Sequence, residues 1–291
     1  MRDLRGKTAV LTGAGGGLGS VIADALAVEG LNLVLVALPG PEMERVCARF
    51  RASQARFRAV AVDFRDADAC TQVTSQAFQA FGQVDLLINN AGVEFTLPYH
   101  ELTEAQINEV LAVNLAAPMH LTRQLLPGML ERRCGHIVNM SSLAAKSTPA
   151  CQEPYAATKA ALTAFTFSLR ATYRGTGVSA SALCPGLVDA GIYARIKAET
   201  GCTGPVLCPS IPPQRVARAV LRAIRHDSPE IILSRYPVRP VLMLHSLSPR
   251  LGLWLMRQMG VHDFFWRIVA ARRRQSGASQ SPTPIPPPPS V

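Results

Sequence analysis

The sequence lacks any apolar stretch long enough to span a bilayer, and its first six residues lack the apolar core of a signal peptide. Its seven cysteines are an odd number without a Cys-x-x-Cys pair, which is typical of reduced thiols rather than of a disulfide framework or a zinc site. It also has no internal repeat and no nucleic-acid-binding motif. These absences predict a cytoplasmic protein with neither a metal site nor a nucleic-acid partner.

Short apolar runs of strand type alternate with helical segments along most of the 291 residues. The expected strands are 7–11, 31–37, 57–62, 84–88, 135–140, 178–184 and 229–234. The expected helices are 18–30, 41–53, 66–81, 103–112, 115–133, 152–174 and 213–226. This alternation predicts an α/β domain over residues 1–235, with a doubly wound, Rossmann-type parallel sheet and helices on both of its faces.

A glycine-rich segment, residues 12–19 (the glycine turn), joins the first expected strand to the first expected helix. Its glycines do not fit the spacing Gly-x-Gly-x-x-Gly, because Leu18 takes the sixth position. They fit Thr-Gly-x-x-x-Gly-x-Gly, with Thr12, Gly13, Gly17 and Gly19. Glycines let a backbone approach a pyrophosphate, and a helix N-terminus offers free N–H groups and a positive dipole end. The turn therefore indicates a dinucleotide site rather than only a tight connection.

Tyr155 and Lys159 lie four residues apart, which is about one turn of the helix expected there. This spacing places an ammonium group beside a phenol, and Ser142 lies thirteen residues before the tyrosine. A free phenol loses its proton near pH 10, and a nearby positive charge lowers that pKa toward the range of a useful general base. The pair alone equally describes an exposed helix face with one aromatic and one cation.

Together with the glycine turn, further segments make the chain resemble the short-chain dehydrogenase/reductase family, in its shorter-subunit branch, over about residues 5–235. They are Asn89-Asn90-Ala91-Gly92 after the fourth expected strand, Asn114 in Val113-Asn114-Leu115, Ser142 at the end of the fifth strand, and Pro185-Gly186 after the sixth. The resemblance implies an NAD(P)-dependent oxidoreductase that transfers hydride between the nicotinamide and an alcohol or carbonyl group.

The resemblance also implies roles for four catalytic residues, Asn114, Ser142, Tyr155 and Lys159. Tyr155 is expected to move the proton of the substrate hydroxyl, and Lys159 to lower the pKa of that tyrosine and to hold the nicotinamide ribose. Ser142 is expected to hydrogen-bond the substrate oxygen. Asn114 is expected to hold a water that links the lysine to solvent. Ser141, the neighbouring hydroxyl, is expected to support the turn.

The cofactor contacts implied by the resemblance include two departures from the family's patterns. The second expected strand ends at Ala37 and Leu38, without the acid that selects NAD or the arginine that selects NADP, and Gly16 replaces a basic residue in the turn. Because no acid repels a 2′-phosphate, NADP is slightly favoured over NAD. Ala190 replaces a frequent cofactor-binding threonine. The expected contacts are Thr12, Gly13, Gly17, Leu18, Gly19, Leu38, Asp63, Asn90, Ala91, Gly92, Tyr155, Lys159, Pro185, Gly186 and Val188, with Asp63 either at the adenine or capping a turn.

The loop after the sixth expected strand, roughly 187–212, is apolar and flexible in composition. It contains Ile192, Tyr193, Ile196, Val206 and Leu207. Such a loop is expected to close over a bound molecule and exclude water. Its composition favours, over simple packing on the sheet, a small hydrophobic substrate of lipid, sterol, retinoid or acyl type.

Residues 236–274 extend beyond the family core and predict a helical C-terminal extension. Both tryptophans, Trp254 and Trp266, lie there among arginines that end in Arg272-Arg273-Arg274. A helical pair that covers the substrate pocket or an oligomer interface is the favoured interpretation. The alternative is a basic helix with aromatic anchors on an anionic membrane, which the net charge of +10 permits. Residues 275–291 are expected to form a disordered or polyproline-like tail.

Two further functions stay open. The unusual end of the second strand, Ala190 and the basic extension also suit a non-catalytic dinucleotide-binding regulator or a membrane-surface interaction protein. The same tyrosine and lysine also suit a related epimerase or dehydratase. Family members usually form dimers or tetramers through the helices that correspond to 103–133 and 152–174, so the resemblance implies a homodimer or homotetramer.

Overall fold

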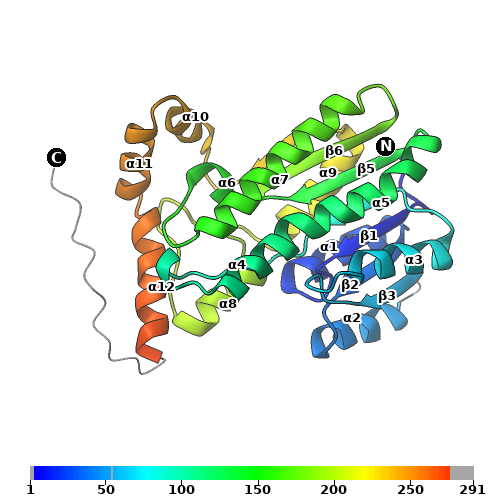
Figure 1. The fold of residues 1–291 in the computed structure, drawn as a ribbon, viewed down its shortest axis with the longest axis horizontal. Helices are drawn as coiled ribbons and strands as arrows, with labels where there is room; N and C mark the ends of the chain where they lie inside the picture. The colour runs from blue at the N-terminus through cyan, green and yellow to red at the C-terminus, as the bar shows by residue number, and fades with distance from the viewer. Residues whose placement is uncertain (1–2, 54, 276–291) are drawn as a thin grey trace.

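The computed structural model describes residues 3–53 and 55–275, and a seven-stranded parallel sheet lies at the centre of that part (Figure 1). The sheet order is β3-β2-β1-β4-β5-β6-β7, so the chain changes direction between β1 and β4. Ligands of open parallel sheets bind at the carboxyl ends of the strands beside such a switch point. The strands are β1 (Thr8–Thr12), β2 (Asn32–Ala37), β3 (Phe57–Ala61), β4 (Leu86–Asn89), β5 (Gly135–Met140), β6 (Val178–Pro185) and β7 (Glu230–Leu233).

Helices cover both faces of the sheet, because its strands are apolar on both sides. Alternate residues of one strand point to opposite faces, so that Leu11 packs in one core cluster and Val10 in the other. The first cluster joins the sheet to α1 (Gly17–Val28), α2 (Pro41–Arg51) and α9 (Pro213–His226). The second joins it to α3 (Ala69–Phe81), α5 (Ala117–Glu131) and the end of α7 (Glu153–Thr172). The predicted doubly wound fold is confirmed.

The segment between the fourth and fifth strands differs from the two separate helices expected there. A π-helical turn, η2 (Ala112–Ala116), joins α4 (Glu104–Leu111) directly to α5. Pro118 has no N–H to donate to the carbonyl four residues earlier, which is consistent with a widened turn at this point. The start of α4 is defined by Thr103 and Gln106, which form a capping box. Asn114 therefore lies within an irregular helical turn.

Short helices also occupy segments that were expected to be loops. They are η1 (Tyr99–Glu101), α6 (Ala144–Ser147) and α8 (Gly191–Thr200). The last of these lies inside the predicted substrate loop, and its buried residues, Tyr193 and Ile196, lie three positions apart on one face. That face packs against Phe264 of the C-terminal extension. The substrate loop is therefore partly helical and held by a distant part of the chain.

The C-terminal extension forms three helices in the described part of the chain, rather than the expected pair. They are α10 (Arg239–Leu247), α11 (Pro249–Gln258) and α12 (Val261–Gln275), and they lie together at one end of the molecule (Figure 1). Within residues 3–53 and 55–275, no helix has both the length and the apolarity to cross a membrane. Gln275 ends α12, and the remainder of the predicted tail, 276–291, lies outside the described residues.

Candidate active site

A cavity of about 740 Å³ lies at the carboxyl ends of the strands. One end is bordered by the glycine turn, the middle by Ser142 and Tyr155, and the other end by apolar residues of the C-terminal extension. This is the edge of the sheet at which a doubly wound fold binds its ligands. All predicted cofactor contacts except Thr12 lie in the cavity wall, as do three of the four predicted catalytic residues, the exception being Asn114.

The glycine turn is packed so tightly that two of its glycines cannot be replaced without moving the backbone. A methyl group on Gly19 would lie 1.9 Å from the carbonyl oxygen of Gly13. Gly13 itself has a φ of +68°, and a methyl group there would lie 2.8 Å from Cα of Ala91. No side chain caps the start of α1, so its first N–H groups are available to an anion. The turn therefore fits the diphosphate of a dinucleotide.

Thr12 lies behind the cavity wall and orders the loop that follows β4. Its hydroxyl oxygen accepts hydrogen bonds from the backbone N–H groups of Asn90 and Ala91, both at 3.0 Å. The Asn90 amide donates in return to the carbonyl oxygens of Thr12 (3.0 Å) and Gly13 (3.3 Å). Thr12 thus fixes the loop that reaches the wall, and its contact with a cofactor stays a prediction.

Ser142, Tyr155 and Lys159 meet where the end of β5 packs on the start of α7. The Tyr155 hydroxyl lies close enough to Ser142 for that residue to lower its pKa, and the Ser142 oxygen accepts from the N–H of Ala144 (3.1 Å). The Lys159 ammonium lies 5.6 Å from the centre of the tyrosine ring and donates to the carbonyl oxygen of Met140 (2.9 Å). The predicted serine, tyrosine and lysine are therefore neighbours at one point of the cavity.

The two residues next to this trio are buried and hold main chain in place. Ser141 donates to the carbonyl oxygen of Lys159 (2.9 Å) and shares a hydrogen bond with Thr163 (2.7 Å), which ties β5 to α7. Asn114 accepts from the N–H of Val93 and donates to its carbonyl oxygen, both at 2.9 Å. Asn114 also lies beside Lys159, because a methyl group on Gly92 would be 3.4 Å from both side chains.

The pKa of Tyr155 is shifted in the direction opposite to the one expected from its spacing to Lys159. Burial raises the pKa of Tyr155 to about 12, opposed by the hydrogen bond with Ser142 and assisted by the charge of Glu94. Burial also lowers the pKa of Lys159 to about 8. The expectation of an acidified phenol is thus wrong for the protein groups alone, because desolvation disfavours the charged forms of both partners.

The end of β2 combines uncharged residues with an acid that the sequence did not indicate. Leu38 lies in the cavity wall as predicted, and Glu42, in the first turn of α2, lies there too. Arg65 also lines the cavity, where Asp63 binds its guanidinium at 2.9 and 2.5 Å, and the hydrogen bond with Arg65 lowers the pKa of that carboxyl. Arg45 is outside the wall and donates to the carbonyl oxygen of Pro41 (3.3 Å).

The far end of the cavity is apolar and is closed by the C-terminal extension. Ile192, Tyr193 and Ile196 of the predicted substrate loop line it, whereas Val206 and Leu207 do not and are 89% and 54% exposed. The part of the predicted loop around Val206 and Leu207 therefore lies outside the cavity wall. The extension contributes Val238, Val241, Leu242, Met256, Met259, Val261, Phe264 and Phe265. A cover over the substrate pocket is one of the two roles that the sequence favours for this extension.

Polar side chains also line the cavity outside the predicted contacts, and Glu94 and Gln152 are among them. Neither belongs to a motif with a fixed spacing, so neither could be identified from the sequence. Within the described residues, no group of three or more histidine, cysteine, aspartate or glutamate side chains is arranged to hold a metal ion. The polar chemistry of the site thus rests on hydroxyl, amide, ammonium, guanidinium and carboxylate groups.

Comparison with known proteins places this geometry in a family. A family model described as short chain dehydrogenase matches residues 7–201. Ketoacyl reductase HetN of Nostoc sp. is 36% identical over 269 residues, which cover 91% of this chain and 93% of the relative.

Two solved structures extend the comparison to the fold. A short-chain dehydrogenase/reductase from Burkholderia phymatum in complex with NAD is similar with a TM-score of 0.77 and 29% identity, over 86% of this chain and 96% of that one. A 3-oxoacyl-(acyl-carrier-protein) reductase from Agrobacterium tumefaciens C58 with NADP bound gives 0.71 and 29%, over 79% and 93%.

Proposed function

The chain belongs to the short-chain dehydrogenase family and is an NAD(P)-dependent oxidoreductase, and from this premise we propose that it acts on a carbonyl or alcohol group of a hydrophobic substrate. The observation that carries the proposal is the position of Ser142, Tyr155 and Lys159 between the glycine turn and an apolar wall. A bound nicotinamide supplies or accepts the hydride there. The protein then has to bind the substrate oxygen and move one proton.

Each of these tasks is assigned to a side chain in the cavity. Ser142 donates a hydrogen bond to the substrate oxygen and holds it beside the tyrosine hydroxyl. Tyr155 gives its proton to that oxygen in reduction and takes it back in oxidation. Lys159 holds the ribose of the cofactor, and Asn114 fixes the main chain beside the ammonium group. The glycine turn and the start of α1 hold the diphosphate.

We propose that Tyr155 is in its protonated, proton-donating form near neutral pH. Because burial keeps the pKa of Tyr155 at about 12, the protonated form that a reductase needs is almost fully populated. The phenolate that oxidation needs rises with pH. Between about pH 6 and 8, oxidation is therefore expected to accelerate up to roughly tenfold per pH unit, while reduction stays nearly constant. Initial rates in both directions test this, and an oxidation rate independent of pH contradicts it.

The proposed cofactor is NADP in preference to NAD, and the difference is expected to be small. Ala37 and Leu38 present no acid at the end of β2, but Glu42 borders the same part of the cavity. Titration with each of the four nicotinamide forms measures the preference directly. Equal or tighter binding of NADH than of NADPH would show that Glu42 takes the place of the missing acid.

The substrate class is tested with a panel of carbonyl compounds of increasing chain length. The apolar wall favours long acyl, sterol or retinoid substrates, and the names of the ketoacyl and 3-oxoacyl reductases similar to this chain favour the acyl type. Each added methylene that enters the wall contributes about 0.8 kcal/mol, so KM is expected to fall with chain length. Dinucleotide binding without turnover of any compound favours a non-catalytic regulator. Substrate conversion without net cofactor oxidation favours an epimerase or dehydratase.

The predicted homodimer or homotetramer is proposed to form through α4, α5 and α7. These helices carry exposed apolar side chains at Leu111, Met119 and Phe167, which are 42%, 41% and 41% exposed. Apolar groups that are exposed on a monomer are commonly covered in an assembly. Light scattering is expected to give a mass of two or four chains, and a Phe167→Asp variant is expected to shift it toward one. A wild-type mass of one chain contradicts the proposal.

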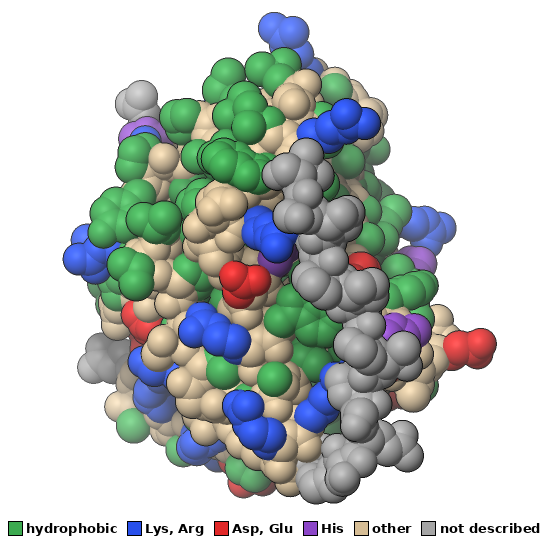
Figure 2. Space-filling view, turned by 90° about the vertical axis from the view of Figure 1, so that its left-hand side faces the viewer, with side chains coloured by type: hydrophobic (Ala, Val, Ile, Leu, Met, Phe, Trp, Pro, Cys, Tyr) green, Lys and Arg blue, Asp and Glu red, His purple; other side chains and the backbone are tan. Residues whose placement is uncertain are grey.

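Peripheral membrane contact is proposed for α10 and α11 rather than for the basic end of α12. Arg272 and Arg273 are engaged in ion pairs with Glu94, Glu199 and Glu101, so they contribute little to a free basic surface. Residues 231–262, in contrast, contain no acidic residue. Figure 2 views the end of the molecule that carries the C-terminal helices. Hydrophobic side chains gather in the upper part of that view, where α10 and α11 lie in Figure 1.

The exposed side chains of α10 and α11 suit an anionic lipid surface. Met243, Leu247 and Trp254 are 65%, 82% and 54% exposed, and the exposed arginines of the same region are Arg235, Arg239, Arg250 and Arg257. Apolar side chains that enter the interface and cations that meet anionic headgroups act together in such contacts. The inner side of the same hairpin lines the cavity, through Leu242 and Met256 among others.

A Leu247→Glu variant is expected to lose binding to anionic vesicles. Sedimentation with phosphatidylserine-containing vesicles is the measurement, with vesicles of phosphatidylcholine alone as the comparison. Val28, 87% exposed at the end of α1, gives the matched control Val28→Glu, which keeps binding. If the wild type ignores both kinds of vesicle and Leu247→Glu instead lowers the mass in light scattering, the face is a subunit interface. The cytoplasmic location expected from the sequence stays a prediction.

A further inference from the structure

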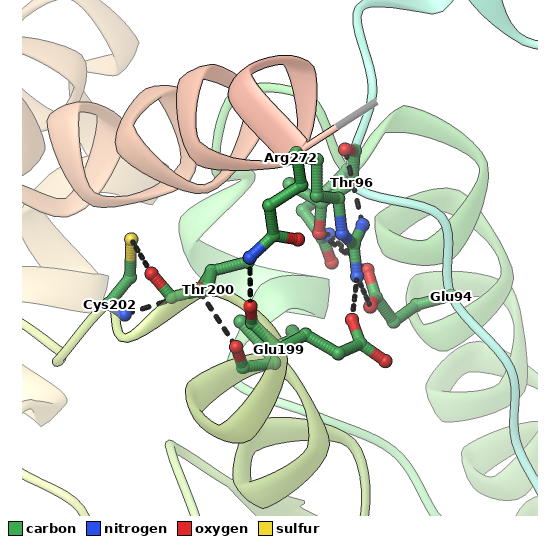
Figure 3. Close-up of polar contacts among 9 residues, drawn as sticks. Glu94, Thr96, Glu199, Thr200, Cys202 and Arg272 are labelled. Carbon is green, nitrogen blue, oxygen red and sulfur yellow. Dashed lines mark hydrogen bonds and ion pairs between the residues drawn. The ribbon is translucent and has the colours of Figure 1, made fainter. Parts of the chain in front are cut away.

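Arg272 of α12 lies between two carboxylates that come from separate parts of the catalytic fold (Figure 3). Its Nη2 atom is 3.7 Å from Oε1 of Glu94, in the loop after β4, and 3.2 Å from Oε2 of Glu199, near the end of α8. Its Nη1 atom donates to the carbonyl oxygen of Thr96 (3.4 Å). One guanidinium group thus connects the C-terminal extension, the substrate loop and the cavity wall.

Glu94 is almost fully buried and accepts a hydrogen bond from Gln152, the residue that precedes α7. Its side chain is 2% exposed, and its Oε2 atom accepts from the hydroxyl of Thr96 (2.6 Å) and the amide of Gln152 (2.8 Å). Gln152 also donates to the Thr96 hydroxyl (2.7 Å) and is the N-cap position of α7, three residues before Tyr155. A continuous set of polar contacts therefore runs from Arg272 to the start of α7.

The charge of Glu94 requires a counter-charge at this depth. A buried carboxylate without a cation is strongly destabilised, and removal of one member of a buried pair leaves the other uncompensated. Arg272 is within ion-pair distance of Glu94. The Glu94 carboxylate in turn disfavours the phenolate form of Tyr155 and so raises the pKa of that tyrosine. The charge that Arg272 supplies therefore acts on the tyrosine through Glu94.

We propose that Arg272 is a positioning residue for the reaction, which balances the charge of Glu94 beside Tyr155 and ties α8 and α12 to the cavity wall. The proposal rests on the proposed function, because Tyr155 has to be the proton donor for the charge of Glu94 to matter. It makes the C-terminal extension part of the reacting centre as well as a cover over it. Arg272 itself does not line the cavity, so it acts through Glu94 and Gln152.

Without Arg272, the carboxylate of Glu94 would face Tyr155 uncompensated, and formation of the phenolate would become harder. At a given pH below the pKa of Tyr155, oxidation would then be slower, and reduction would slow with it because an enzyme does not change the equilibrium between the two directions. Other charged or titratable groups nearby stay in place and set the baseline of both profiles. They are Lys159 and Glu153 on α7, Cys151 before it, Glu199 on α8, Arg273 on α12 with its partner Glu101, and Cys184 on β6.

The test is a double-variant cycle on the full chain, with Arg272→Gln, Glu94→Gln and both changes together. Arg272→Gln is expected to lower kcat/KM for oxidation about three- to tenfold. The increase of this rate with pH is therefore expected to lie about half a pH unit or more higher. The double variant is expected to return the pH profile to that of the wild type, because neither charge is then present. Arg272→Lys keeps the positive charge but not the planar guanidinium, so it is expected to keep most of the wild-type rate, whereas a merely structural arginine would lose activity in both variants.

Arg274→Gln is the matched control, since Arg274 is an exposed arginine on the same helix, and its profile is expected to equal that of the wild type. An unchanged oxidation rate in Arg272→Gln, or a double variant no closer to the wild type than Arg272→Gln alone, overturns the proposal. Thermal unfolding of the same variants separates this outcome from failure of the proposed function. If the wild type turns over nothing, the assigned reaction fails, and a Tm lost in Arg272→Gln but regained in the double variant still supports the ion pair.

Discussion

Replacement of Tyr155 by phenylalanine is expected to lower kcat about 10²–10⁴-fold and to leave the Kd for the dinucleotide nearly unchanged. The substitution removes one hydroxyl group and keeps the ring that packs beside Lys159. Because that hydroxyl lies close to Ser142 at the point where the substrate oxygen is proposed to bind, its loss removes the proton donor but not the cavity. The measurements are steady-state rates from cofactor absorbance and a fluorescence titration of the cofactor.

Tyr99→Phe is the control for the loss of a tyrosine hydroxyl, because Tyr99 is 57% exposed on η1 and lies outside the cavity wall. It is expected to behave as the wild type. Turnover by Tyr155→Phe within a few-fold of the wild type would show that another group delivers the proton. Lys159 is then the next candidate, since burial lowers its pKa to about 8 and makes the ammonium a stronger acid than usual.

The sheet could be predicted from the sequence because its strands are buried on both faces and read as continuous apolar runs. Leu86, Leu87 and Ile88 are an example, since all three are fully buried although neighbours point to opposite faces. The π-helical turn around Asn114 could not be predicted in this way. Its apolar pattern is that of an ordinary helix, and the widened turn coincides with a proline four residues after Asn114.

The site was predictable where its residues are close in sequence and not where they meet through the fold. Tyr155 and Lys159 adjoin because they occupy successive turns of one helix. Glu94, Gln152 and Arg272 meet only because a loop, a helix N-terminus and the C-terminal extension converge. Their contact could not be predicted, because no regular spacing in the sequence links these three residues. The direction in which the Tyr155 pKa shifts could not be predicted for the same reason. Burial is a property of the tertiary structure, and the spacing of two residues does not reveal it.

Replacement of Gly19 by alanine is expected to weaken dinucleotide binding at least about tenfold, a loss of about 1.4 kcal/mol or more. The added methyl group would lie 1.9 Å from the carbonyl oxygen and 2.7 Å from the carbonyl carbon of Gly13, both of which are backbone atoms. The turn has to shift as a whole, which moves the N–H groups at the start of α1 away from the diphosphate. Overpacking of this kind costs about 1–3 kcal/mol, so Tm is also expected to fall by roughly 2–10 °C.

Gly16→Ala separates this clash from a general intolerance of the turn to side chains. A methyl group on Gly16 would meet only the Gly13 carbonyl oxygen, at 3.6 Å, which is an ordinary contact, and its φ of −71° suits any residue. This variant is expected to keep both its Tm and most of its dinucleotide affinity. If Gly19→Ala binds the cofactor as tightly as Gly16→Ala does, the diphosphate is not held by the backbone of this turn. The dinucleotide would then have to reach Tyr155 along another part of the cavity wall.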